Sequence, residues 1–159
     1  MSKIDNTDRK IINLLLEDGR MAASEIARRM NSTERSVRYR IERLVENSVI
    51  KITAVVNPRS LGYTVMADVF IEVEPARIMD VARTLSEHES VSYVACSIGE
   101  RDVSAQIVAR DSDEIYALAT EFIGKLPGVR KTTTSIVPIK LKDVYQWRIP
   151  DSDTKQDEA

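Results

Sequence analysis

The chain has 159 residues, of which 43% are hydrophobic and 30% are charged, a composition typical of a globular protein. A single cysteine and a single histidine exclude an intrachain disulfide and a two-histidine or cysteine-based metal site, so we expect no metal, no cofactor and no catalytic residue. No apolar run approaches the roughly 18 residues of a membrane helix, which favours a cytoplasmic protein without membrane contact.

The net charge of −2 hides an asymmetry between the two parts of the chain. Residues 1–51 contain 11 Lys and Arg against 8 Asp and Glu, whereas residues 52–159 contain 12 against 17. A basic half joined to an acidic half raises the question of a nucleic-acid partner for the first half.

The first fifty residues predict three helices followed by a strand. Capping residues at 5–8 precede an apolar stripe up to residue 16, and a second stripe spans residues 22–30. Thr33 is a predicted N-cap, after which Val37, Ile41, Leu44 and Val45 repeat as one buried face. Residues 49–56 are predicted to form a wing strand. This order is typical of a winged helix-turn-helix domain.

The third helix carries polar side chains away from its buried face. Together with the cap, they are the candidate DNA contacts: Thr33, Arg35, Ser36, Arg38, Tyr39, Arg40 and Arg43. The residues up to Tyr39 are placed to reach base edges in the major groove, and the two later arginines suit phosphates. A three-helix bundle with a charged surface is the alternative that the pattern leaves open.

A second pattern follows a hinge predicted at residues 57–62. Strands are predicted over 63–73, 91–98, 103–109 and 129–141, with helices after Pro75 and after Asp111. This is the order of a ferredoxin-like βαββαβ domain, so the fold class is α+β. We expect a DNA-binding domain over 1–56, a ferredoxin-like domain over 63–142, and an extension over 143–159 whose last nine residues are disordered.

Two helices can cover only one face of a four-stranded sheet. Met66, Phe70 and Tyr93 are predicted on the other face, where leaving apolar surface in water is unfavourable. Packing of two such sheets would bury them, and a dimer also suits a DNA reader with two half-sites. Cys96 is expected to be a buried strand residue, and Trp147 to pack on the body of the chain or on a neighbouring subunit.

The chain resembles the Lrp/AsnC family of feast/famine transcription regulators over residues 4–141. The similar segments are the opening helix at 4–20, Glu25-Ile-Ala-Arg-Arg-Met30, the recognition helix at 33–44, and Asn57-Pro-Arg-Ser-Leu-Gly62. The resemblance implies binding to double-stranded promoter DNA and homodimers that form through the C-terminal sheets and assemble further to tetramers or octamers. It also implies an amino-acid effector bound between C-terminal domains.

The resemblance also implies which residues would bind that effector. The family's Gly-x-x-Asp loop is matched by Gly99, Glu100, Arg101 and Asp102, and its Thr-x-Thr by Thr132 and Thr134. Glu100-Arg101 replaces an acidic–aromatic pair that many members have. Asn31 and Ser48 stand where the family has glycines. A simple hairpin turn at 99–102 remains the alternative to an effector loop.

Two other functions share this layout of domains. One is a sirohaem-decarboxylase-like enzyme, and the other is a DNA-binding protein that organises chromatin without sequence specificity. We expect a sequence-specific regulator because the arginines of the third helix have no purpose in an enzyme.

Overall fold

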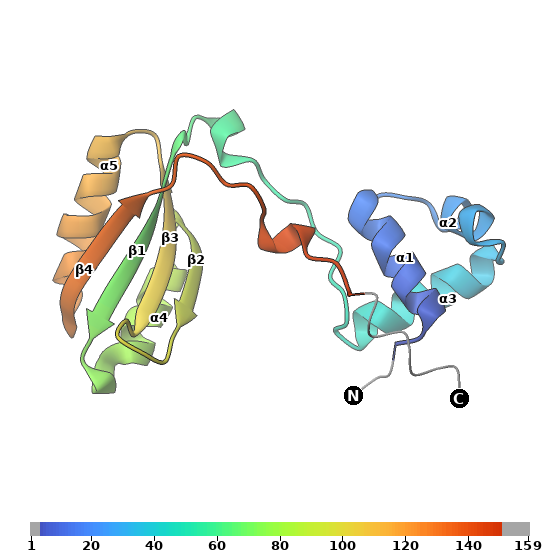
Figure 1. Ribbon diagram of the computed structural model, residues 1–159, viewed down its shortest axis with the longest axis horizontal. Coiled ribbons are helices and arrows are strands. Elements are labelled where there is room, and N and C mark those ends of the chain that lie inside the picture. Colours follow the sequence, from blue (N-terminus) through green and yellow to red (C-terminus); the bar gives the residue numbers. More distant parts are fainter. Residues whose placement is uncertain (1–3, 151–159) are drawn as a thin grey trace. The chain divides into compact units, whose positions relative to one another are not determined.

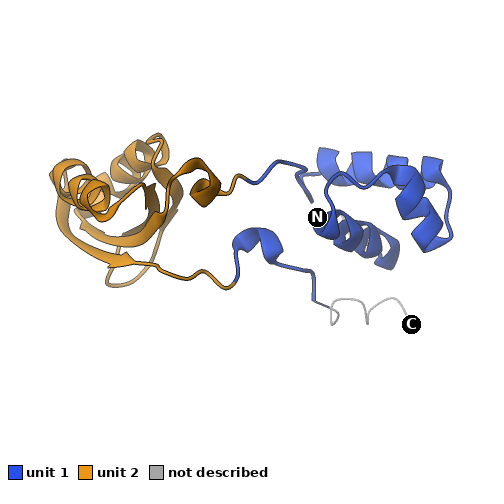
Figure 2. Cartoon of the chain, turned by 90° about the horizontal axis from the view of Figure 1, so that it is seen from above, with its two compact units in different colours: residues 1–55, 142–159 blue, residues 56–141 orange. Residues whose placement is uncertain are grey.

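The computed structural model describes residues 4–150, so the predicted disorder of residues 151–159 lies outside the described residues. The chain divides into two compact units (Figure 2). Residues 1–55 with 142–159 form the first unit, and residues 56–141 form the second. Among the helices described, none is long and apolar enough to cross a membrane.

The first unit contains the three predicted helices, α1 (Asn6–Glu17), α2 (Ala23–Met30) and α3 (Glu34–Glu46) (Figure 1). A reciprocal pair of hydrogen bonds between Asp5 and Asp8, a capping box, begins α1. The helices pack around a small apolar core of Ile11, Ile26, Ala27 and Val37. The helix-turn-helix prediction is therefore confirmed.

Two backbone positions shape the ends of α2 and α3. Asn31 follows α2 with φ 51°, and Ser48 follows α3 with φ 56°, so both lie in the left-handed region. They are the described non-glycine residues with positive φ, and the resemblance stated above implies glycine at both positions. A side chain in the left-handed region strains the backbone, so both turns carry strain that glycine would avoid.

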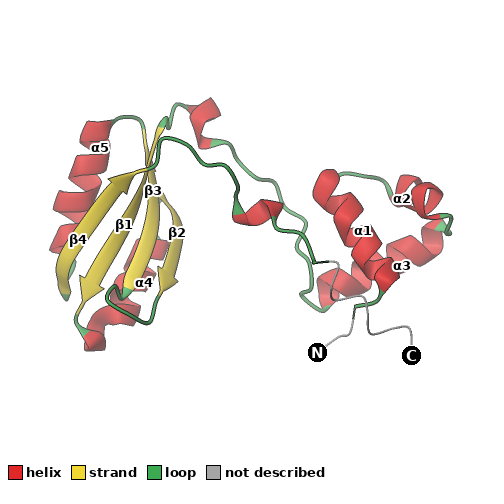
Figure 3. Cartoon of the chain, viewed as in Figure 1, coloured by secondary structure: helices red, strands yellow, loops and turns green. Residues whose placement is uncertain are grey.

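The predicted wing strand is absent. Residues 50–57 have no regular secondary structure (Figure 3), and Ile52, Val55 and Val56 expose more than half of their surface. A strand needs a hydrogen-bonded neighbour, and no described segment pairs with these residues. A short 3-10 turn at Pro58–Leu61 follows and ends at Gly62, whose φ of 89° suits glycine.

The second unit is the predicted four-stranded antiparallel sheet. Its elements are β1 (Val65–Val73), α4 (Ile78–Ser86), β2 (Val91–Cys96), β3 (Val103–Ala109), α5 (Ser112–Ala117) and β4 (Val129–Ile136), and irregular helical turns continue α5 to residue 125. The strand order is β2-β3-β1-β4. Both helices cover one face (Figure 1), which confirms the ferredoxin-like α+β fold.

The two faces of the sheet alternate along β1 as the sequence predicts. Ala67, Val69 and Ile71 are fully buried under the helices, whereas Met66 and Phe70 are only half-buried on the opposite, open face. Polar groups interrupt the open face, because Gln106 donates a hydrogen bond of 2.8 Å to Asp68 there. The open face is therefore amphipathic rather than uniformly apolar.

Predictions about the ends of β2 and β4 and about the burial of Cys96 are wrong, and β2 ends at Cys96 instead of residue 98. β4 ends at Ile136 instead of residue 141, since Pro138 has no N–H with which to continue the ladder. Cys96 is exposed instead of buried, because it is the last residue of the edge strand β2. Pro138 limits β4, and the position at the edge of the sheet exposes Cys96, so neither outcome follows from the apolar pattern alone.

Candidate nucleic-acid interface and effector loop

The outward face of α3 presents arginine and tyrosine side chains. At about 100° of rotation per residue, Arg35 and Tyr39 lie opposite the buried Val37 and Leu44, with Arg38 next to them. The side chain of Arg38 is 62% exposed and Tyr39 is 63% exposed. Arg35 is also exposed and makes no ion pair with the described part of the chain. This face can accept a polyanion without rearrangement.

Two of the other predicted contacts hold the start of α3 in place. Thr33 is the N-cap, and its Oγ1 accepts a hydrogen bond from the backbone N–H of Ser36 at 3.3 Å. Arg38 pairs with Glu34 one turn earlier in an exposed ion pair, which contributes little and is easily exchanged for a phosphate. The cap fixes the helix terminus from which the outward side chains project.

The structure places Arg40 and Arg43 in intramolecular ion pairs rather than on the outward face. Arg40 Nη1 donates to Asp8 Oδ1 at 2.8 Å and to Asp5 Oδ2 at 2.7 Å. Arg43 Nη2 donates to Asp8 Oδ2 at 2.6 Å. The Asp8 side chain is fully buried, so the two guanidinium groups neutralise a carboxylate inside the protein. The sequence predicts that these arginines contact phosphates, but in the structure the carboxylates of Asp5 and Asp8 already bind their guanidinium groups.

The acidic partners of this cluster were read from the sequence only as helix-capping residues. The pKa of Asp5 is lowered overall. Burial raises this pKa, but hydrogen bonds from the backbone N–H of Asp8 and from the Arg40 side chain lower it by more than burial raises it. The signal that could have revealed the cluster is the matched spacing. Two acids three residues apart meet two arginines three residues apart, each pair on one helical turn.

The predicted effector loop, residues 99–102, is tied to the sheet by its own residues. Gly99 has φ 147°, which glycine adopts more easily than other residues. Asp102 Oδ2 accepts the backbone N–H of Val73 at 2.7 Å, and its own N–H donates to the carbonyl of Ile71 at 3.0 Å. The guanidinium of Arg101 lies 4.2 Å from the ring centre of Phe70, over the open face.

The structure does not bring all the predicted effector residues together within one chain. Thr132 and Thr134 are the register partners of Ile71 and Val69, so they share the helix-covered side of the sheet. Arg101 lies on the open side. Glu100 is exposed in the loop. A single subunit thus offers two separate half-sites instead of one closed pocket.

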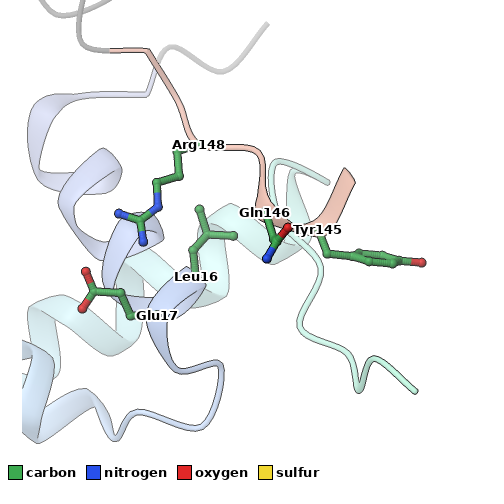
Figure 4. A pocket seen from close by; sticks show the side chains of 5 residues that line it. All are labelled: Leu16, Glu17, Tyr145, Gln146 and Arg148. Atoms are coloured by element: carbon green, nitrogen blue, oxygen red, sulfur yellow. The ribbon is translucent and has the colours of Figure 1, made fainter. Parts of the chain in front are cut away.

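Sequence reasoning did not find a pocket that lies in the first unit. It is lined by Leu16, Glu17, Tyr145, Gln146 and Arg148, and Figure 4 shows the Arg148 and Glu17 side chains facing each other across it. Trp147 lies beside it but is 59% exposed, so the predicted packing of Trp147 on the body of this chain is not found. Packing on a neighbouring subunit stays a prediction.

A capped helix-turn-helix with an arginine-bearing third helix, followed by a separate α+β domain, defines a DNA-binding regulator with a second functional domain. Within the described residues no cluster of His, Cys, Asp or Glu could hold a metal. Residues 4–45 match the model of the AsnC-type helix-turn-helix domain, and residues 66–146 match that of the Lrp/AsnC ligand binding domain. The chain belongs to the Lrp/AsnC family of helix-turn-helix transcriptional regulators.

Relatives and solved structures agree with this assignment. The chain is 38% identical over 146 residues to an uncharacterised HTH-type transcriptional regulator of Pyrococcus abyssi, covering 91% of this chain and 90% of that protein. It is 34% identical over 140 residues to the regulator LrpA of Pyrococcus horikoshii, covering 87% and 99%. A Neisseria meningitidis transcriptional regulator in complex with L-Met has the same fold, with a TM-score of 0.83, 21% identity, and coverage of 89% and 94%.

Proposed function

We propose that this protein regulates transcription in the cytoplasm by binding double-stranded promoter DNA through α3. The observation that carries the proposal is the outward face of α3, where Arg35, Arg38 and Tyr39 are exposed while Val37 and Leu44 anchor the helix. Arginine pairs bidentately with guanine in the major groove, and Tyr39 can donate a hydrogen bond to a base or a phosphate. Ser36 is half-buried beside the N-cap, and its hydroxyl is a candidate for a contact with the DNA backbone.

We propose residues 1–56 as the DNA-binding domain, 57–62 as the hinge and 63–142 as the assembly domain. The open sheet face supports assembly, because Phe70 and Met66 are half-buried and Tyr93 is 55% exposed. Sheet-on-sheet packing of two copies would bury them and place two α3 helices on one duplex. Light scattering should give a dimer, tetramer or octamer, and Phe70→Glu should lower the mass. A monomeric wild type contradicts this assembly.

We also propose that an amino acid bound by the second domain modulates the regulator. Support comes from the match to a ligand-binding domain and from the L-Met complex of the Neisseria structure. Asp102 uses Oδ2 on the chain itself, which leaves Oδ1 for the α-ammonium group of a ligand. Because Thr132 and Thr134 lie on the other side of the sheet, another subunit would have to complete the pocket. Calorimetric titration with the twenty amino acids tests this, and no heat with any of them contradicts it.

The experiment for the DNA-binding function is selection of bound duplexes from a random pool by the full-length protein. A regulator should enrich one sequence and bind it at least about a thousandfold more tightly than random DNA. Equal affinity for both would favour a non-specific chromatin protein. No binding to either would refute the proposed function.

A further inference from the structure

Four charged side chains of the first unit form a network between the start of α1 and the second half of α3. Asp5, the N-cap of α1, and Asp8 within α1 contact Arg40 and Arg43 of α3 at 2.6–2.8 Å, and these four residues are called here the Asp–Arg cluster. Asp8 is fully buried, and the side chains of Arg40 and Arg43 are 25% and 36% exposed. A buried carboxylate is tolerated only when charged donors satisfy it, so these contacts are a condition of the fold.

The geometry of the cluster also fixes the orientation of α3. Each carboxylate oxygen of Asp8 accepts from a different arginine, at 2.8 Å from Arg40 and 2.6 Å from Arg43. These arginines lie one turn apart, so two directed bonds from one point on α1 resist both rotation and sliding of α3. Since a bidentate arginine–guanine contact depends on angle, a small rotation of α3 would misplace Arg35 and Arg38.

The cluster also decides which charges reach DNA. α3 carries four arginines. Arg40 and Arg43 pair with the carboxylates of Asp8 and of Asp5, the N-cap of α1, whereas Arg38 pairs only with Glu34 in an exposed ion pair that a phosphate can replace. The outward Arg35 and Arg38 remain for a duplex. The Asp–Arg cluster thus limits the number of phosphate contacts that α3 can make, and with it the sequence-independent part of binding.

Resting on the proposed DNA-binding function, we propose that Asp8 is a positioning residue for DNA reading. It holds Arg40 and Arg43 against α1, which sets the angle of the recognition helix and keeps both arginines away from phosphates. Specificity in this protein therefore depends on a carboxylate that never touches DNA.

The test compares Asp8→Asn with wild type on the selected duplex and on random DNA over a series of salt concentrations. The asparagine keeps the size and one acceptor but loses the charge, so Arg43 loses its carboxylate partner and Arg40 keeps only Asp5. We expect the ratio of specific to random affinity to fall roughly tenfold or more. We also expect the slope of log affinity against log salt to steepen by about 0.9 for each arginine that reaches a phosphate. If Asp8 has only a structural role, Asp8→Asn should lower the unfolding temperature but leave the affinity ratio and the salt slope of the folded protein unchanged. That result would overturn the proposal.

Two further variants keep the test decisive if Asp8→Asn does not fold. Asp8→Glu retains the charge on a side chain one methylene longer, so it should keep both arginines paired and the salt slope near that of wild type, and a steepened slope would overturn the proposal. Arg43→Gln should leave the salt slope unchanged, because Arg43 is held by Asp8. A slope flattened by about 0.9 would mean that Arg43 contacts a phosphate, and would overturn the proposal.

Failure of this proposal and failure of the proposed function give different results. If the wild type enriches no sequence and binds no duplex, the DNA-binding function itself is refuted. If the wild type is sequence-specific and the folded Asp8 variants match it in salt slope and specificity, only the positioning role is refuted.

Discussion

Ser48→Gly should stabilise the first unit, because Ser48 has φ 56° at the end of α3. A non-glycine residue in the left-handed region costs about 1–2 kcal/mol. Glycine removes that strain but loses about 0.5–1 kcal/mol more chain entropy on folding. The hydrogen bond of 2.9 Å from Ser48 N–H to the carbonyl of Val45 is kept, since glycine has the same backbone. The difference between the two ranges is a net gain of about 0–1.5 kcal/mol, centred near 0.75 kcal/mol.

Differential scanning calorimetry measures this effect as a rise of about 2–8 °C in the transition of the first unit. Asn31→Gly, at φ 51°, should gain less, because asparagine tolerates the left-handed region better than serine. Ser24→Gly is the matched control within α2, and it should lose about 0.5 kcal/mol, because helical backbone disfavours glycine. If Ser48→Gly and Ser24→Gly destabilise equally, the strain argument is wrong.

Two further predictions concern hydrogen bonds and charge. Asp102→Ala should destabilise the second unit by about 1–3 kcal/mol in urea denaturation, because it leaves the N–H of Val73 unpaired, whereas the exposed Glu100→Ala should have almost no effect. Hydrogen bonds from Arg28 and Arg29 lower the pKa of Glu25 from 4.5 to about 2. Because the folded-state pKa is depressed, Glu25 contributes stability that is present above pH 4.5 and is lost as the pH falls towards 2. The melting temperature should therefore fall less over this pH range in Glu25→Gln than in wild type.

Much of the fold follows from local patterns in the sequence. Apolar spacing placed all three helices of the first unit, and strict alternation along β1 separated the buried Val69 and Ile71 from the half-buried Phe70. These succeed because a helix or strand with one buried face repeats its apolar residues at a characteristic period. The wing strand at 49–56 failed because a local apolar pattern does not supply the hydrogen-bonded neighbour that a strand needs.

The candidate site was only partly predictable. Exposure of Arg35, Arg38 and Tyr39 follows from helical geometry once the buried face is known. The pairing of Arg40 and Arg43 with Asp8 does not, because it joins residues more than thirty positions apart and depends on how α1 packs on α3. The matched spacing of two acids and two arginines is compatible with this pairing, but it does not show that the two helices meet there.

The central claim is that the outward face of α3 reads DNA bases. The most direct measurement titrates wild type and Arg38→Ala against the selected duplex and a set of its single base-pair variants. The account predicts that Arg38→Ala weakens binding by about 1–3 kcal/mol and abolishes discrimination at one base pair, while the other positions keep theirs. Unchanged affinity, or discrimination retained at every base pair, would contradict it.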